Sequence, residues 1–377
     1  MSHRLHGINY RVLTSLVVVG VPVLLLASFL VLENGRAQLR DAFGLKLAQR
    51  AEQSASAIDA YLYRRIGDVS MLARIPQVRN EAIRGSGRPL DPRAATDMDN
   101  AFAALDVKRP AVASLLGTET SKYFADITRQ DPIYREILLT DRAGRLVAAS
   151  NLTSDYTQAD EDWWKRVMAD PSRGEATVSD VRWDDSAHTF AMEIAVPVPG
   201  PDERPVGVLK VVGDVREMLA SVAGMDLGDA GGAMVIRRNG SIVFSRRAVQ
   251  PSARFFAADR LRDRLASATA SAEPSRFFFS AAADDGLPQI VGVATSQLSS
   301  TFPHLPWVVV TWQPESELLA PVRTQFRSLM LVLALTGLCV LGLALWFSVR
   351  LAAKPFETDM GLVPHPRIAR VAEEESV

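Results

Sequence analysis

The sequence has almost no cysteine and no excess of either charge. Its 377 residues include one cysteine, Cys339, so no disulfide can form within the chain and no cysteine-based metal site is available. Lysine and arginine number 42 against 43 aspartates and glutamates, a balance that lacks the basic surface of a nucleic-acid-binding protein. A disulfide scaffold is therefore excluded, and nucleic acid is not expected as a partner.

Motifs of common active sites are also missing. The sequence contains no paired-histidine zinc spacing, no phosphate-binding loop and no serine elbow. Asp184 and Asp185 could form an acid or metal pair, but an exposed turn before a strand is the expected role. The histidines are scattered along the chain: His3, His6, His188, His304 and His365. We predict a protein that is not an enzyme and that has neither a metal nor a cofactor.

Two long apolar runs are the most prominent features that are present. Residues 12–32 and 328–349 contain no charged side chain, and each run reaches the roughly 20 residues that a membrane-spanning helix needs. A cleaved signal peptide is the alternative for the first run, but the apolar core of such peptides is only about 7 to 15 residues long. We therefore predict a two-span protein of the bacterial inner membrane, with the intervening part periplasmic or extracellular.

A long amphipathic helix is predicted after the first run. Apolar residues recur at steps of three and four from residue 34 to about residue 84, and Gly85 and Gly87 end the pattern. Further helices are expected over 94–105 and 110–127. The apolar positions of the long helix are Leu39, Phe43, Leu47, Ile58, Leu62, Val69 and Leu72.

Two stretches with the pattern of antiparallel sheets follow. In the first, apolar segments flank a turn at 141–144, a short helix is expected at 160–169, and three more strands complete five, with helices on one side. The second stretch repeats this order from Met234, with a glycine turn at 238–240 and a helix over 256–267. The predicted fold class is α+β, with two PAS-like antiparallel-sheet modules in tandem on a long N-terminal helix, flanked by two transmembrane helices.

Several segments of the first module resemble the double Cache (dCache) extracellular sensor family. The resemblance covers roughly residues 34–320. The residues on which the resemblance rests are Ser154-Asp155-Tyr156-Thr157-Gln158-Ala159-Asp160-Glu161-Asp162-Trp163-Trp164, then Asp180, Asp184-Asp185-Ser186, Ala195-Val196-Pro197-Val198, and Val206-Gly207-Val208-Leu209 running to Asp214. The resemblance implies a two-span membrane receptor, here without a cytoplasmic output domain.

The resemblance also implies a division of the chain. The expected parts are a cytoplasmic N-terminus (1–11), a transmembrane helix (12–32), a stalk helix and helical segment (34–104), a membrane-distal Cache module (105–225), a membrane-proximal Cache module (226–315), a helical junction (316–327), a second transmembrane helix (328–349) and a short cytoplasmic tail (350–377).

A ligand site is predicted in the distal module. Aromatic faces and carboxylates near one another suit a small organic cation. The alternative is that the tryptophans are core anchors and the acids are turn and cap residues. The candidate ligand-binding residues are Tyr156, Asp162, Trp163, Trp164, Asp180, Trp183, Asp184 and Asp214.

The resemblance narrows the class of ligand. Amino-acid-binding members of the family carry an arginine two residues before the tryptophan and a tyrosine directly after it, where this chain has Glu161 and Trp164. A ligand carboxylate would therefore lack its usual partner. An amine, a polyol or another small metabolite is expected in place of an α-amino acid.

The function predicted from these features is sensing. The chain would bind a small molecule and signal through its transmembrane helices or a partner protein, such as a separate kinase or regulator, and the stalk could form a homodimer. The alternative is a structural or assembly protein of the envelope that uses its Cache modules as a protein docking surface.

Overall fold

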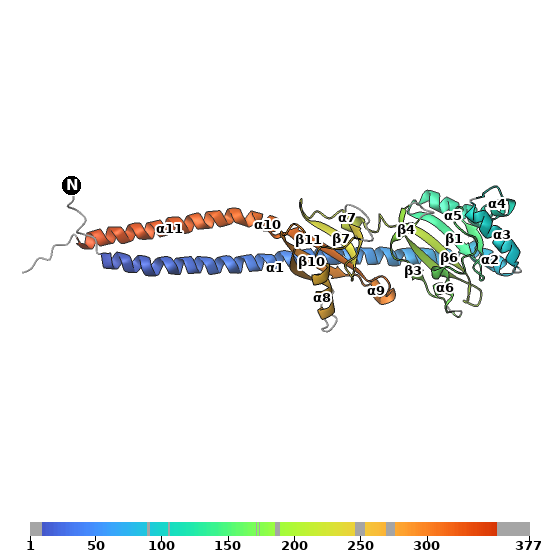
Figure 1. The fold of residues 1–377 in the computed structure, drawn as a ribbon, viewed down its shortest axis with the longest axis horizontal. Coiled ribbons are helices and arrows are strands. Elements are labelled where there is room, and N and C mark those ends of the chain that lie inside the picture. The colour runs from blue at the N-terminus through green and yellow to red at the C-terminus, as the bar shows by residue number, and fades with distance from the viewer. Residues whose placement is uncertain are drawn as a thin grey trace, which may run out of the picture. The chain divides into compact units, whose positions relative to one another are not determined.

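The fold is α+β, with two antiparallel sheets and a long N-terminal helix (Figure 1). The computed structural model describes residues 10–88, 91–104, 106–170, 172, 174–184, 189–245, 253–268 and 276–352. Residues 38–320 form one compact unit that holds both sheets. Asp185, His188 and most of the predicted tail lie outside the described residues. The predicted tandem of PAS-like modules is confirmed at the level of architecture.

The helical N-terminal part contains more helices than predicted. The long helix ends at Ala73, because Pro76 opens a new helix and has no amide hydrogen to continue the old one. The predicted helix over 110–127 is likewise divided at Gly117 and Thr118, where the Thr118 hydroxyl caps the next helix by accepting from the Ser121 amide. The helices are α1 (Tyr10–Ala73), α2 (Pro76–Ser86), α3 (Pro92–Ala103), α4 (Pro110–Leu116) and α5 (Glu119–Gln130).

The first sheet has six strands in place of the five predicted. The order is β2-β1-β6-β5-β3, and β4 also pairs with β5. The short helix α6 (Asp162–Met168) precedes β3. The strands are β1 (Tyr134–Thr140), β2 (Leu146–Ala149), β3 (Thr177–Val178), β4 (Arg182–Asp184), β5 (Thr189–Pro199) and β6 (Pro205–Asp214).

The extra strand arises because one predicted strand is interrupted. The Ser179 amide still donates to the Glu193 carbonyl, but the Glu193 amide donates to the Ser179 hydroxyl, which replaces a backbone partner. Asp180 then caps the next amide, since its Oδ1 accepts from Val181 N at 2.8 Å. Residues 179–181 therefore form a short segment between β3 and β4 with a carboxylate directed out of the sheet.

The second sheet has the five strands that the sequence predicts. Its order, β8-β7-β11-β10-β9, repeats that of the first sheet, so the repeat inferred from the turns extends to the topology. The strands are β7 (Gly232–Arg237), β8 (Ile242–Ser245), β9 (Arg276–Ala282), β10 (Pro288–Thr295) and β11 (Trp307–Pro314). The accompanying helices are α7 (Ala220–Ala223), α8 (Ala258–Ala268), α9 (Leu298–Thr301), α10 (Glu315–Leu318) and α11 (Ala320–Ala352).

Helix α1 lies against both sheets, and its approach to the second is close. A Cβ added to Gly292 of β10 would lie 2.3 Å from Ala48 N and from Leu47 C, so only glycine admits the helix backbone here. The Thr311 hydroxyl donates to the Leu47 carbonyl at 3.0 Å. One apolar cluster joins α1 to both sheets, with members such as Ile58, Leu62, Ile137, Val211, Val235 and Val309. Burial of this cluster is the main force that orders the two modules along α1.

The two predicted transmembrane helices are not found as spans. Residues 12–32 lie in α1 and residues 328–349 in α11. Among the described residues, no helix combines the length and the apolarity needed to cross a membrane.

Candidate functional site

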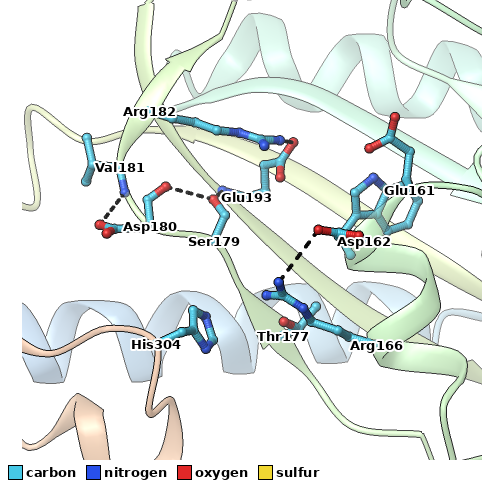
Figure 2. A pocket seen from close by; sticks show the side chains of 11 residues that line it. Glu161, Asp162, Arg166, Thr177, Ser179, Asp180, Val181, Arg182, Glu193 and His304 are labelled. Atoms are coloured by element: carbon cyan, nitrogen blue, oxygen red, sulfur yellow. Dashed lines mark hydrogen bonds and ion pairs between the residues drawn. The ribbon is translucent and has the colours of Figure 1, made fainter. Parts of the chain in front are cut away.

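A cavity of about 300 Å³ opens beside the interrupted strand of the first sheet (Figure 2). Helix α6, segment 177–182 and β5 supply most of its walls, and one residue comes from the second module. The lining residues are Glu161, Asp162, Trp163, Arg166, Thr177, Ser179, Asp180, Val181, Arg182, Glu193 and His304. Its volume is at the lower end of the range of small-molecule sites.

A buried glutamate carries two cations at the base of this cavity. Glu193 Oε1 accepts from Lys210 Nζ at 2.8 Å and from Arg182 Nη2 at 2.6 Å, and only 5% of its side chain is exposed. Lys210 Nζ also lies 5.0 Å from the centre of the Trp163 ring, a cation–π distance. Because a buried carboxylate is costly unless it is paired, Glu193 is a group already occupied by two protein cations.

The carboxylates at the mouth of the cavity differ in their partners. Asp162 lies 3.9 Å from Arg166 one helical turn later, and both side chains are exposed. Glu161 precedes α6 at its N-cap position without making a side-chain capping bond. Over the ranges that the structure describes, the Glu161 carboxylate has no hydrogen-bond or ion-pair partner. It is the acidic group of the cavity that can accept a ligand without displacing a protein cation.

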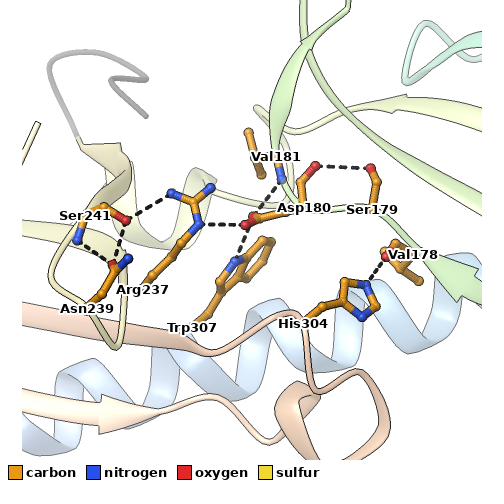
Figure 3. A network of polar contacts seen from close by, with 9 residues as sticks. All are labelled: Val178, Ser179, Asp180, Val181, Arg237, Asn239, Ser241, His304 and Trp307. Carbon is orange, nitrogen blue, oxygen red and sulfur yellow. Dashed lines mark hydrogen bonds and ion pairs between the residues drawn. The ribbon is translucent and has the colours of Figure 1, made fainter. Parts of the chain in front are cut away.

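Asp180 lines the cavity, and its carboxylate also contacts side chains of the second sheet (Figure 3). Its Oδ2 accepts from Arg237 Nε at 2.6 Å, and its Oδ1 accepts from Trp307 Nε1 at 3.1 Å. Close to it, His304 Nε2 donates to the Val178 carbonyl. The wall of the cavity at residues 178–181 is thus held by side chains of the second module.

The structure brings Asp162, Trp163 and Asp180 together and places the other predicted site residues elsewhere. Trp164 packs beside Trp163 in a small cluster with Val167. Trp183 is half exposed and meets the Phe190 ring edge-on at 5.2 Å. Asp184 belongs to β4, and its backbone pairs with Thr189.

Tyr156 packs against the apolar cluster that contains Phe102. Its ring is 6.0 Å from that of Phe102, and burial raises the pKa of its hydroxyl. Asp99 of α3 holds the loop, because its Oδ1 accepts from the amides of Tyr156 and Thr157 at 3.0 and 2.8 Å. The Tyr156 side chain therefore packs against Phe102 and is not among the residues that line the cavity beside α6.

Asp214 lines a separate cavity of about 400 Å³, at the end of β6. Burial opposes ionisation of this carboxyl, but hydrogen bonds from Arg216 and Arg135 outweigh the effect of burial and lower its pKa. Arg135 Nη2 and Arg216 Nη2 each approach Oδ2 to 2.7 Å. This carboxylate is consequently occupied by two guanidinium groups.

Several residues of the site were not singled out from the sequence. Glu193 and Lys210 are charged positions in the strands β5 and β6, which are otherwise mostly buried and apolar, and this interruption is the signal that could have indicated them. Arg182 is an exposed residue of β4 and carries no such signal. His304, Arg237 and Trp307 reach the site from more than 50 positions away, as Arg237 does to Asp180, and no local pattern predicts that approach.

No protein-family model and no curated protein matches this chain. Solved structures do match it. The chain is similar to chemoreceptor sensory domains. The sensory domain of Campylobacter jejuni Tlp3 with isoleucine bound is 10% identical, with 75% of this chain and 97% of that chain covered and a TM-score of 0.46.

Two Pseudomonas domains give similar values. The ligand-binding domain of Pseudomonas fluorescens CtaA in complex with L-serine is 16% identical, with coverage of 74% and 99% and a TM-score of 0.41. The ligand-binding domain of the Pseudomonas aeruginosa PAO1 amino acid chemoreceptor PctB, in complex with L-Arg, is 16% identical, with coverage of 73% and 96% and a TM-score of 0.41.

Proposed function

We propose that this chain is an extracytoplasmic sensor that binds a small amine in the cavity beside α6. The observation that carries the proposal is the position of Glu161. Its side chain lines the cavity, and its carboxylate has no hydrogen-bond or ion-pair partner among the residues that the structure describes. The Trp163 indole forms the adjoining wall. An ammonium group placed there gains a charge-assisted hydrogen bond and an aromatic surface, the two features that recognise organic cations.

The charges of the cavity favour an amine over an α-amino acid. Recognition of a ligand carboxylate requires a cation, and the arginines that line the cavity are engaged: Arg166 with Asp162, and Arg182 with Glu193. A carboxylate would have to compete with these acids for the guanidinium groups. An ammonium group meets no such competition at Glu161.

Membrane anchoring is the second part of the proposal. Large apolar side chains are exposed along the start of α1 and along α11, among them Val23, Phe29, Leu335 and Leu338, which are 56 to 67% exposed. Exposed apolar surface of this extent needs a partner, and a bilayer is the partner that the uncharged runs of the sequence suit. The signal would leave through these helices or through a separate kinase or regulator.

A thermal-shift screen of the purified full chain tests the proposal. The probes are ethylamine, choline, putrescine and histamine, each compared with a matched neutral alcohol. We expect at least one amine to raise the melting temperature of the wild type, and Glu161→Gln to abolish the rise. Glu119→Gln, which alters an exposed acid of α5, is the matched control. Absence of any shift with all four amines would refute the proposal.

A further inference from the structure

The cavity is completed by residues of the second sheet. Arg237, the last residue of β7, and Trp307, the first residue of β11, both donate to the carboxylate of Asp180, at 2.6 and 3.1 Å (Figure 3). Asp180 belongs to the segment between β3 and β4 that forms one wall of the cavity. Two strands of one module thereby hold a cavity-lining segment of the other.

The second module holds the side chains of Arg237 and Trp307 in place. Arg237 Nη1 also donates to the Ser241 hydroxyl at 3.3 Å, and Ser241 in turn donates to Asn239 Oδ1 at 2.8 Å within the β7–β8 turn. Trp307 is 1% exposed, so its indole cannot rotate away without disrupting the core. Arg237 and Trp307 are therefore held in position by their own module, independently of their contact with Asp180.

The same module also reaches the cavity itself. His304 lies in the connection between α9 and β11, lines the cavity and donates to the Val178 carbonyl. The segment between β10 and α9 is anchored on α1, because Asp59 accepts from the Ser296 hydroxyl at 2.5 Å and from the Gln297 amide at 2.8 Å. The segment from β10 to β11, which includes α9, is thus bound to α1 at Ser296 and to β3 at His304.

We propose that the binding site is shared between the modules, with Arg237 and Trp307 as positioning residues for the cavity wall and His304 as a residue in contact with the bound amine. This inference depends on the proposed function for its ligand. The wall at 178–181 keeps its form because Asp180 is held, so the affinity for an amine depends on side chains of the second sheet. Ligand binding in the cavity of the first module in turn alters the contacts that Asp180 makes with Arg237 of β7 and Trp307 of β11.

Two experiments test the shared site: a measurement of amine binding, and a measurement on the protein without ligand. The binding measurement is calorimetric titration of the full chain with the amine from the set ethylamine, choline, putrescine and histamine that gives the largest thermal shift. We expect Arg237→Gln to weaken binding about tenfold, the effect of losing roughly one charge-assisted hydrogen bond. Arg237→Lys should restore part of the affinity. Arg238→Gln, at the neighbouring exposed position, should leave it unchanged.

The ligand-free measurement is amide hydrogen exchange. In Arg237→Gln the amides of Ser179 and Val181 should exchange faster than in the wild type, while those of β1 should not change. Trp307→Phe provides a second variant that keeps an aromatic ring in the core, and it should show the same local change in exchange.

The outcomes separate the two proposals. Binding that depends on Glu161 but is unaffected in Arg237→Gln, Trp307→Phe and His304→Gln would overturn the shared site and leave the sensor proposal standing. Unchanged exchange at Ser179 and Val181 would also overturn the shared site, whether or not an amine binds. Absence of binding by all four amines to the wild type would overturn both proposals.

Discussion

Arg135 Nη2 donates to Asp214 Oδ2 over 2.7 Å and so joins the beginning of β1 to the end of β6. Arg216 completes the arrangement from the other side, with two nitrogens within 3.1 Å of the same carboxylate. Only 6% of the Asp214 side chain is exposed. In this chain the aspartate acts as an ionic anchor at the end of β6, an interior strand of the first sheet.

Asp214→Asn should therefore destabilise the protein at neutral pH. The arginines lower the pKa of Asp214 in the folded state, so its contribution to the free energy of unfolding is fully present above the unfolded pKa of about 3.9. It declines below that value and is lost as the pH falls through the lower folded-state pKa. We expect a loss of about 1 to 3 kcal/mol at pH 7, reduced from a fully buried pair because Arg216 is largely exposed. Urea denaturation at pH 7 and pH 3 measures it.

The difference between the wild type and Asp214→Asn should shrink at pH 3. Asp202→Asn, at an exposed acid of the β5–β6 turn, serves as the control and should change stability little. An equal difference at both pH values would show that Asp214 does not act through its charge.

Asp59 should show the opposite dependence on pH. Burial raises the pKa of this carboxyl, and hydrogen bonds from Ser296 and Gln297 only partly offset that effect. Its contribution is therefore full below the unfolded pKa of about 3.9 and declines as the pH rises through the folded-state value. Relative to Asp59→Asn, the wild type should gain stability between pH 7 and pH 4 in urea denaturation. A constant difference over this interval would contradict the assignment.

Gly292→Ala should separate α1 from the second sheet. The added Cβ would lie 2.3 Å from backbone atoms of the helix, which cannot move aside as a flexible side chain could. We expect a loss of about 1 to 3 kcal/mol in the free energy of unfolding, typical of overpacking. Gly67→Ala is the matched control: no atom lies within 4 Å of its added Cβ, and the helix should gain about 0.5 to 1 kcal/mol. Equal effects of the two changes would contradict the close approach of α1 to β10.

Local patterns in the sequence predict most of the fold. The second sheet follows from its turns and apolar segments, because each strand is a continuous run bounded by glycine or polar residues. The predicted elements are wrong where one or two residues interrupt the regular backbone hydrogen bonding. Pro76 divides the first long helix, and Ser179 and Asp180 divide one strand by substituting side-chain hydrogen bonds for backbone ones.

The candidate site was less accessible to sequence reasoning. Asp162, Trp163 and Asp180 share a cavity, but the partners that define their chemistry come from distant positions. Lys210 reaches Glu193 from the neighbouring strand, and Arg237 reaches Asp180 from the second sheet. Such pairs depend on the register of the sheets and on the packing of the modules, which no spacing along the chain encodes.

The central claim is that Glu161 binds an ammonium group in the cavity beside α6. The most direct test is isothermal titration of the full chain with the amine that gives the largest thermal shift, for the wild type, Glu161→Gln and Glu119→Gln. The account predicts one site per chain, affinity at least about tenfold weaker in Glu161→Gln, and no change in Glu119→Gln. Equal affinities in all three proteins, or no heat of binding in the wild type, would contradict it.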